Sequence, residues 1–174
     1  MSDPRFPIGP FSIEGDMTPD TLHGFVEIIA NAPAEFREAV NGLNDAQLDT
    51  PYRDGGWTIR QVIHHVADSH MNSYIRFKLS LTEDIPTIKP YAEDRWAEIE
   101  DAKDGDIEVS LCLIDCLHKR WVQCLRAMTI EQWQRKFNHP DRGTVPLDES
   151  AALYAWHCKH HLAHITHLRE RKDW

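Results

Sequence analysis

Residues 58–81, which read TIRQVIHHVADSHMNSYIRFKLSL, decide the fold. Their apolar side chains recur at helical intervals, at Ile59, Val62, Ile63, Val66, Tyr74, Phe77 and Leu81. That spacing gathers them on one face of an α-helix. Thr58 and Gln61 match a capping box, in which the hydroxyl and the amide satisfy free backbone N–H groups. We therefore predict a long amphipathic helix that begins at Thr58 and ends near Leu81.

Helical periodicity continues on both sides of this stretch. Three further long helices are predicted, over about residues 18–43, 107–128 and 147–171. Thr18 before Pro19 is a favourable helix start, and Pro33 is expected to kink or split this first helix.

The segments between the long helices predict only minor elements. A short helix is predicted within 91–101, a turn of a minor hairpin at 138–143, and an irregular arm over 1–17. No convincing strand separates the long helices. The predicted fold is therefore all-α, a four-helix bundle with short extra helices.

Composition limits the class of protein. With 174 residues, 41% of them hydrophobic, we expect a single domain over residues 1–174 with one buried core. The net charge of −9 argues against nucleic-acid binding, because phosphate contacts need clustered Lys and Arg. No apolar run approaches the length that crosses a bilayer, and the N-terminus lacks the apolar stretch of a signal peptide. We expect a cytoplasmic protein without a membrane partner.

The four cysteines are Cys112, Cys116, Cys124 and Cys158, and none forms a Cys-x-x-Cys pair. Three of them lie on one apolar helical pattern, so we expect buried free thiols and no disulfide framework. A reactive thiol at Cys158, beside the histidines, is the less favoured interpretation.

Histidine is concentrated in this chain. Eight of the eleven histidines fall in two clusters on predicted helices, namely His64, His65 and His70, and His157, His160, His161, His164 and His167. Imidazole is the commonest protein ligand for transition metals. Two histidines four residues apart on one helix, with a third from another helix, would make a three-nitrogen site that leaves room for water or substrate.

A helical wheel separates the two spaced pairs of the last helix. From the centre of its apolar face, His161 lies at about 40°, His157 at about 80°, His164 at about 100° and His160 at about 140°. His157 and His161 therefore fit an inward-facing metal site best. His164 is a candidate for contacting a ligand or carrying a proton, and His160 and His167 are expected to face solvent. Packing or surface histidines that bind nothing are the alternative.

The wheel of residues 58–81 is less decisive, because His64 and His65 flank the apolar stripe at similar angles. Polar neighbours on the side of His65, among them Asp68 and Asn72, favour it over His64, whose side resembles an outer face. His70 lies on the stripe itself and is expected to be a hydrogen-bonded core residue. The zinc-protease pattern His-Glu-x-x-His is excluded, since Cys158 stands where its glutamate would be.

Two motifs resemble a known family. One is PYRDGGWT at residues 51–58, continuing through Gln61 and the His64-His65 pair to ADSHMNSYIRFK at 67–78. The other is YAWH at 154–157 with HHLAHIT at 160–166. Together with FPIG at 6–9 they resemble the YfiT-type metal-dependent hydrolases of the DinB superfamily over nearly the whole chain.

The resemblance implies a DinB-like four-helix bundle that carries one divalent metal ion on three histidines. Matched motif by motif, these ligands are His65, His157 and His161. The resemblance also implies Zn²⁺, with Ni²⁺ as the alternative, a cytoplasmic location and a homodimer. Related thiol transferases use the same scaffold to join a low-molecular-weight thiol to an electrophile.

The leading hypothesis for function is a metal-dependent hydrolase that activates water toward a small-molecule substrate. The general acid and base stay unknown; Asp68 could orient His65 or accept a proton, or be a solvated carboxylate, and His164 and Asn72 are further candidates near the metal. The alternative is a metal-dependent thiol S-transferase, in which Arg53 or Arg76 would hold carboxylates of a bacillithiol-like thiol. A third interpretation is a non-catalytic metal-binding bundle whose ion has a fourth protein ligand such as His164.

Overall fold

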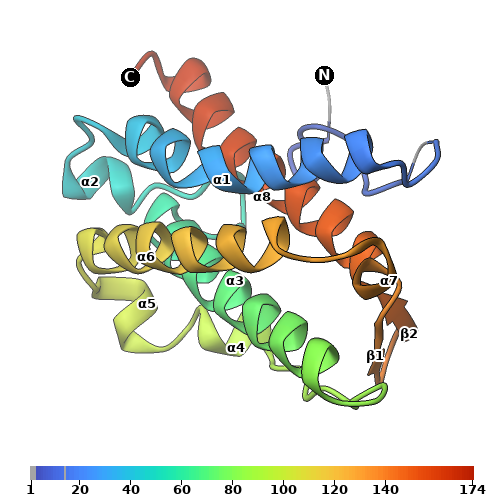
Figure 1. Cartoon of the computed structure of the whole chain (residues 1–174). Helices are drawn as coiled ribbons and strands as arrows, with labels where there is room; N and C mark the ends of the chain where they lie inside the picture. The colour runs from blue at the N-terminus through green and yellow to red at the C-terminus, as the bar shows by residue number, and fades with distance from the viewer. Residues whose placement is uncertain (1–2, 14) are drawn as a thin grey trace.

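Four long helices form the body of the molecule. The computed structural model describes residues 3–13 and 15–174, and the long helices are α1 (Pro19–Val40), α3 (Ile59–Thr82), α6 (Ile107–Arg126) and α8 (Leu147–Lys172). α1 packs against α6 and α8, and α3 packs against the same two helices (Figure 1). The predicted all-α four-helix bundle is confirmed.

Side-chain caps fix where these helices begin. The Thr58 hydroxyl accepts from the backbone N–H of Gln61, and the Gln61 amide oxygen accepts from the N–H of Thr58, which completes the predicted capping box. At the start of α1, the Thr18 hydroxyl accepts from the N–H of Thr21, with Pro19 in the first turn. α1 ends at Val40, slightly before the predicted limit, because Gly42 turns the chain with a φ of 78°.

Pro33 is predicted to kink or split the first helix. α1 is one continuous helix, so the split is wrong. A proline has no N–H to donate to the carbonyl four residues earlier, which is that of Ile29. His118 of α6 donates to this carbonyl instead, with 2.6 Å between its Nδ1 and the oxygen. A neighbouring helix thus satisfies the group that the proline leaves unpaired.

Short elements connect the long helices. They are α2 (Asp45–Leu48), α4 (Glu93–Trp96), α5 (Glu100–Asp104), α7 (Ile130–Trp133), β1 (Lys136–His139) and β2 (Gly143–Pro146). The strands pair antiparallel with Phe137 opposite Val145, which confirms the predicted hairpin. The region predicted as one short helix contains two, α4 and α5, and α2 and α7 were not predicted.

The core lies where the four long helices meet. Phe36, Phe77 and Trp121 are its largest fully buried side chains, and burying each such side chain contributes about 2–3 kcal/mol. Phe77 meets Trp121 edge to face, with 5.6 Å between the ring centroids. Among the described residues, no helix combines the length and apolar character needed to cross a bilayer.

The cysteines differ from the expectation of buried thiols. Cys112 and Cys116 are exposed on α6 and Cys124 is half-buried, because the apolar stripe of α6 runs through Leu111, Ile114 and Trp121 instead. Cys158 is buried as predicted, and burial raises the pKa of its thiol, which disfavours the reactive thiolate. All four are free thiols.

The described part of the N-terminal arm has no helix or strand up to the start of α1, as predicted. It lies against α8: the Trp156 indole donates to the carbonyl oxygen of Gly9 over 3.3 Å, and the Phe6 ring lies 6.1 Å from that of His160. The arm therefore covers a face of α8 that would otherwise meet solvent.

Candidate metal centre

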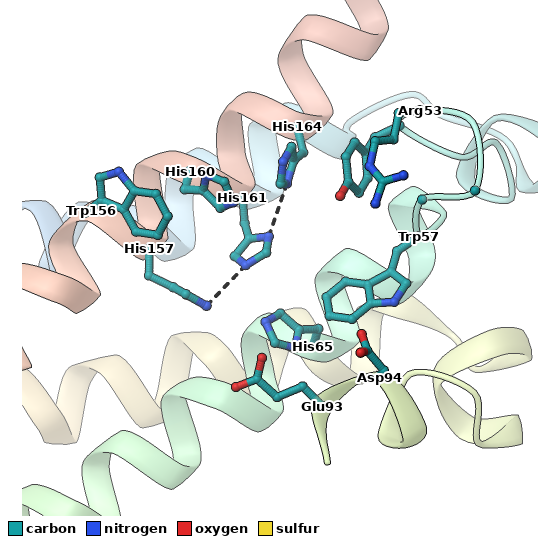
Figure 2. Close-up of a pocket in the computed structure, with 13 residues that line it drawn as sticks. Arg53, Trp57, His65, Glu93, Asp94, Trp156, His157, His160, His161 and His164 are labelled. Atoms are coloured by element: carbon teal, nitrogen blue, oxygen red, sulfur yellow. Dashed lines mark hydrogen bonds between the residues drawn. The ribbon is translucent and has the colours of Figure 1, made fainter. Parts of the chain in front are cut away.

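His65, His157 and His161 meet between α3 and α8 (Figure 2). One nitrogen of each ring lies within 4.8 Å of the corresponding atoms of the other two. Nε2 of His157 is 3.1 Å from Nε2 of His161, as expected for residues one turn apart on one helix. The structure thus brings together the three residues singled out in the sequence as metal ligands.

The loop before α3 completes the wall around His65. Tyr52 N–H donates to the Trp57 carbonyl over 3.0 Å, which closes the loop and holds the Trp57 ring 4.6 Å from that of His65. Gly56 has no room for a side chain here, since a Cβ would lie 2.7 Å from Cγ of Arg53 and 3.2 Å from the Arg53 carbonyl. This packing fixes one side of the site.

A cavity of about 360 Å³ opens onto the three histidines. Its wall includes Arg53 and Trp57 from the loop, and Glu93 and Asp94 from α4. Figure 2 shows the two carboxylates on the side of His65, across the cavity from the α8 histidines. Basic, acidic and imidazole groups therefore surround a space suited to a small molecule.

Comparison with known proteins identifies the family. The model of the DinB superfamily matches residues 28–165. The chain belongs to the DinB superfamily.

Relatives of this DinB-superfamily protein match it along its whole length. Proteins from Bacillus cereus and Bacillus anthracis, each named "Putative metal-dependent hydrolase", are 52% identical and cover 100% of both chains. The solved structure of YfiT from Bacillus subtilis has a TM-score of 0.95 at 48% identity and covers 98% of each chain. YfiT is described as "a probable metal-dependent hydrolase with an unusual four-helix bundle topology".

Burial keeps the imidazoles of His65, His157 and His161 neutral. It lowers the pKa of His65 to about 4, and it holds the pKa values of His157 and His161 well below the ordinary value. The neighbouring histidines lower these pKa values further, because two imidazolium ions in contact would repel. A neutral imidazole is the form that binds a metal. At neutral pH, metal binding therefore does not have to displace a proton from an imidazolium ring.

His160 and His64 differ from the sequence interpretation. His160 was expected to face solvent but is buried, because Trp156 stacks on its ring at 4.3 Å and Phe6 of the arm covers it. His64 was expected on an outer face but is also buried, with its Nδ1 2.8 Å from the Ser110 hydroxyl. Contacts with segments distant in sequence bury both rings. His167 is partly buried and is not one of the three candidate ligands.

His164 forms a second group with His160 and His161, whose ligand atoms also lie within 4.8 Å of one another. Its Nδ1 is 3.4 Å from Nδ1 of His161, the ring nitrogen turned away from His157. Its ring stacks on Tyr52, with centroids 3.9 Å apart. His164 therefore contacts a candidate ligand from behind rather than joining the group of three.

The other polar candidates lie away from the cavity. Asp68 is half-buried, and burial together with the nearby charge of Asp101 raises its pKa to about 6. Asn72 donates to the Asp68 backbone carbonyl over 2.9 Å. Neither these two residues nor Arg76 is among the described residues that line the cavity.

Two histidines continue the site into the core. His70 is fully buried, as predicted; its Nε2 is 3.0 Å from Nδ1 of His157, and its Nδ1 is 2.7 Å from Nε2 of His118. Sequence reasoning missed His118. Its place on the apolar stripe of α6, between Ile114 and Trp121, was the available signal.

Glu93 was also missed, because only the fold of the segment after α3 brings α4 beside His65. Its side chain reaches solvent, but the surrounding cavity wall partly desolvates the carboxyl and raises its pKa, and the charge of Arg76 opposes that rise. A carboxyl with a raised pKa can exchange a proton closer to neutral pH.

Proposed function

We propose that this chain is a metal-dependent hydrolase of the cytoplasm, acting on a small molecule with one divalent ion held by His65, His157 and His161. The proposed ion is Zn²⁺, with Ni²⁺ as the alternative. The observation that carries the proposal is the convergence of three neutral imidazoles from two helices on one cavity. The names of the full-length relatives support the same class of reaction.

The donor set fits such an ion. Nitrogens bound to one zinc ion lie about 2.1 Å from it, so donors within 4.8 Å of one another need only small ring rotations to share it. All three are nitrogen donors in neutral form, which suits zinc and nickel. When bound, the ion would act as a Lewis acid and lower the pKa of a coordinated water to about 7.

The side chains around the ligands supply the remaining functions. Glu93 lies across the cavity from the α8 histidines. Its carboxylate is proposed to accept a proton and to return it to the leaving group. Arg53 is proposed to bind an anionic group of the substrate, because its positively charged guanidinium belongs to a residue in the cavity wall. Trp57 and Trp156 form aromatic walls that restrict water.

Elemental analysis of protein purified without added metal tests the site. We expect about one divalent ion per chain in the wild type and a large loss in His65→Ala and His157→Ala. His23→Ala, on the exposed face of α1, is the matched control and should retain the ion. Equal metal content in all four proteins would exclude the proposed ligands.

A panel of activated esters and amides tests the reaction. Turnover should disappear with a chelator, return with Zn²⁺ or Ni²⁺, and be absent from His161→Ala. Turnover that survives complete metal removal would contradict metal-dependent hydrolysis.

Thiol transfer is the second candidate, and Arg53 in the cavity wall favours it as well, because its guanidinium could bind a carboxylate of a low-molecular-weight thiol. Incubation of metal-loaded protein with such a thiol and monochlorobimane separates the two reactions. Conjugate formation that is lost in His161→Ala would support transfer, and hydrolysis without conjugation would exclude it.

A non-catalytic binding module would need a fourth protein ligand in place of water. The position of His164 behind His161 argues against that role. A cobalt-substituted sample with a closed four-nitrogen shell would nevertheless favour the binding module over both enzymes. The homodimer stays a prediction, which light scattering of the purified protein tests directly.

A further inference from the structure

A line of hydrogen bonds joins all four long helices to one candidate ligand. It begins at the Ile29 carbonyl of α1, which Pro33 leaves without its helical donor. His118 of α6 lies 2.6 Å from this oxygen through Nδ1, and its Nε2 lies 2.7 Å from Nδ1 of His70 on α3. Nε2 of His70 lies 3.0 Å from Nδ1 of His157 on α8.

The carbonyl sets the direction of every bond in this line. An oxygen of a peptide carbonyl only accepts, so His118 carries its proton on Nδ1. A neutral His118 then presents a lone pair at Nε2, so His70 donates from Nδ1. A neutral His70 in turn accepts at Nε2, so His157 donates from Nδ1. Nε2 of His157 then keeps a lone pair that faces Nε2 of His161 at 3.1 Å.

These bond directions hold for neutral rings, and the surroundings of His70 and His118 keep both rings neutral. His70 and His118 are 0% and 1% exposed, and no carboxylate is hydrogen-bonded to either ring among the described residues. Burial also lowers the pKa of His118 to about 4. Trp121 and Tyr154 pack edge-on against His70 and exclude water from the line.

We propose that Pro33, His118 and His70 are positioning residues that lock His157 in the Nδ1–H tautomer, with Nε2 aimed at His65 and His161. The line itself is independent of metal. The role of this line of hydrogen bonds, which is to present a preformed nitrogen ligand to a metal, rests on the proposed function. A ligand whose tautomer is already correct binds without first moving a proton, and such supporting contacts typically change metal affinity by about 10–100-fold.

His161 provides an internal comparison. Its Nδ1 faces only Nδ1 of His164 at 3.4 Å, and Nε2 of His164 is buried without a hydrogen-bond partner among the described residues. No carbonyl fixes the direction of that contact. In the metal-free protein, Nε2 of His161 donates to the lone pair on Nε2 of His157 over 3.1 Å, and a zinc ion bound at that nitrogen would displace the proton. The tautomer of His161 is therefore expected to differ between the metal-free and zinc-loaded protein, whereas that of His157 is not.

Long-range ¹H–¹⁵N correlation spectra of the full-length, metal-free protein test the lock, because they report which ring nitrogen carries the proton. The His157 signals are assigned by their absence from His157→Gln. We expect a single Nδ1–H tautomer for His157 before and after addition of Zn²⁺. An Nε2–H tautomer, or a mixture, in the metal-free wild type would overturn the proposal whether or not zinc binds.

Two variants of His118 test the cause. His118→Phe keeps an aromatic ring but removes both polar atoms, so His157 should become a mixture of tautomers and zinc affinity should fall about 10-fold or more. His118→Gln keeps a donor and an acceptor and should restore one tautomer and most of the affinity. Unchanged tautomer and affinity in His118→Phe would overturn the proposal.

If His118→Phe fails to fold, the wild-type and His118→Gln spectra still decide between a lock and a mixture. The positioning line and the metal-dependent hydrolase can also be refuted independently of each other. A wild type that shows the locked tautomer but binds no zinc would refute the metal-dependent hydrolase and leave the positioning line in place.

Discussion

Individual histidines in this protein have different roles because their surroundings differ. His65, His157 and His161 present nitrogens to one space, whereas His70 and His118 use both ring nitrogens for hydrogen bonds in the core. His160 is packed between aromatic rings. Residue type alone would make all of these metal ligands, and only the direction of each ring separates the candidate ligands from their supports.

Acid should destabilise the metal-free protein partly through His118. Its pKa is about 4 in the folded protein and about 6.5 in the unfolded chain, so between these values the unfolded chain binds more protons. The contribution to stability is complete above pH 6.5 and is lost as the pH falls toward 4, by about 3 kcal/mol in total. Urea unfolding between pH 7 and pH 4 should therefore show a smaller loss for His118→Gln than for wild type. An equal or larger loss in the variant would contradict this assignment.

Glu93 is predicted to be the proton-transferring residue of the cavity. Glu93→Gln keeps the size of the side chain but removes the titratable group, so hydrolytic turnover should fall about 100-fold or more while metal content is unchanged. Glu100→Gln, on an exposed carboxylate outside the cavity wall, should have little effect. Full activity in Glu93→Gln would assign the proton transfer to another group, with Asp94 the next to test.

At the scale of elements, the site depends on how α1, α3, α6 and α8 are held together rather than on any one of them. α8 supplies two candidate ligands and α3 the third, while α6 and α1 provide the buried contacts behind them. The loop and α4 close the cavity from the other side. Each helix therefore has both a packing face and a polar contact that bears on the site.

Pro33 should destabilise the folded protein less than a proline inside a helix normally does. Replacing such a proline by alanine gains about 3 kcal/mol when the freed carbonyl is unpaired. Here His118 already satisfies the Ile29 carbonyl, and a new N–H at position 33 would compete with it. Pro33→Ala should therefore stabilise the protein by clearly less than about 3 kcal/mol in urea unfolding, and shift the His118 ring signals. A full gain with unchanged His118 signals would show that the carbonyl bond is unimportant.

The long helices could be predicted from sequence because periodicity and caps are local signals. The capping box at Thr58 and the stripe through Phe77 both survive in the structure. The orientation of His64 and His160 could not be predicted, because α5, α6 and the N-terminal arm cover them from distant parts of the chain. Glu93 reaches the cavity for the same reason, through the placement of a four-residue helix.

For the whole molecule, metal binding and folding should be coupled. The three candidate ligands are brought together only when α3 and α8 pack, so an ion that binds them stabilises the folded state. At a free zinc concentration of 100 times Kd the free energy of unfolding should rise by about 2.7 kcal/mol. Thermal unfolding with and without zinc measures this rise. His65→Ala should show a much smaller one, and an equal rise in that variant would place the ion elsewhere.

Anomalous diffraction at the zinc edge, from crystals of the zinc-loaded protein, tests the central claim most directly. We expect one strong peak between α3 and α8, bonded to His65 and to Nε2 of both His157 and His161, with His164 too far away to bind. A peak held by His160 and His164, or no peak among these helices, would contradict it.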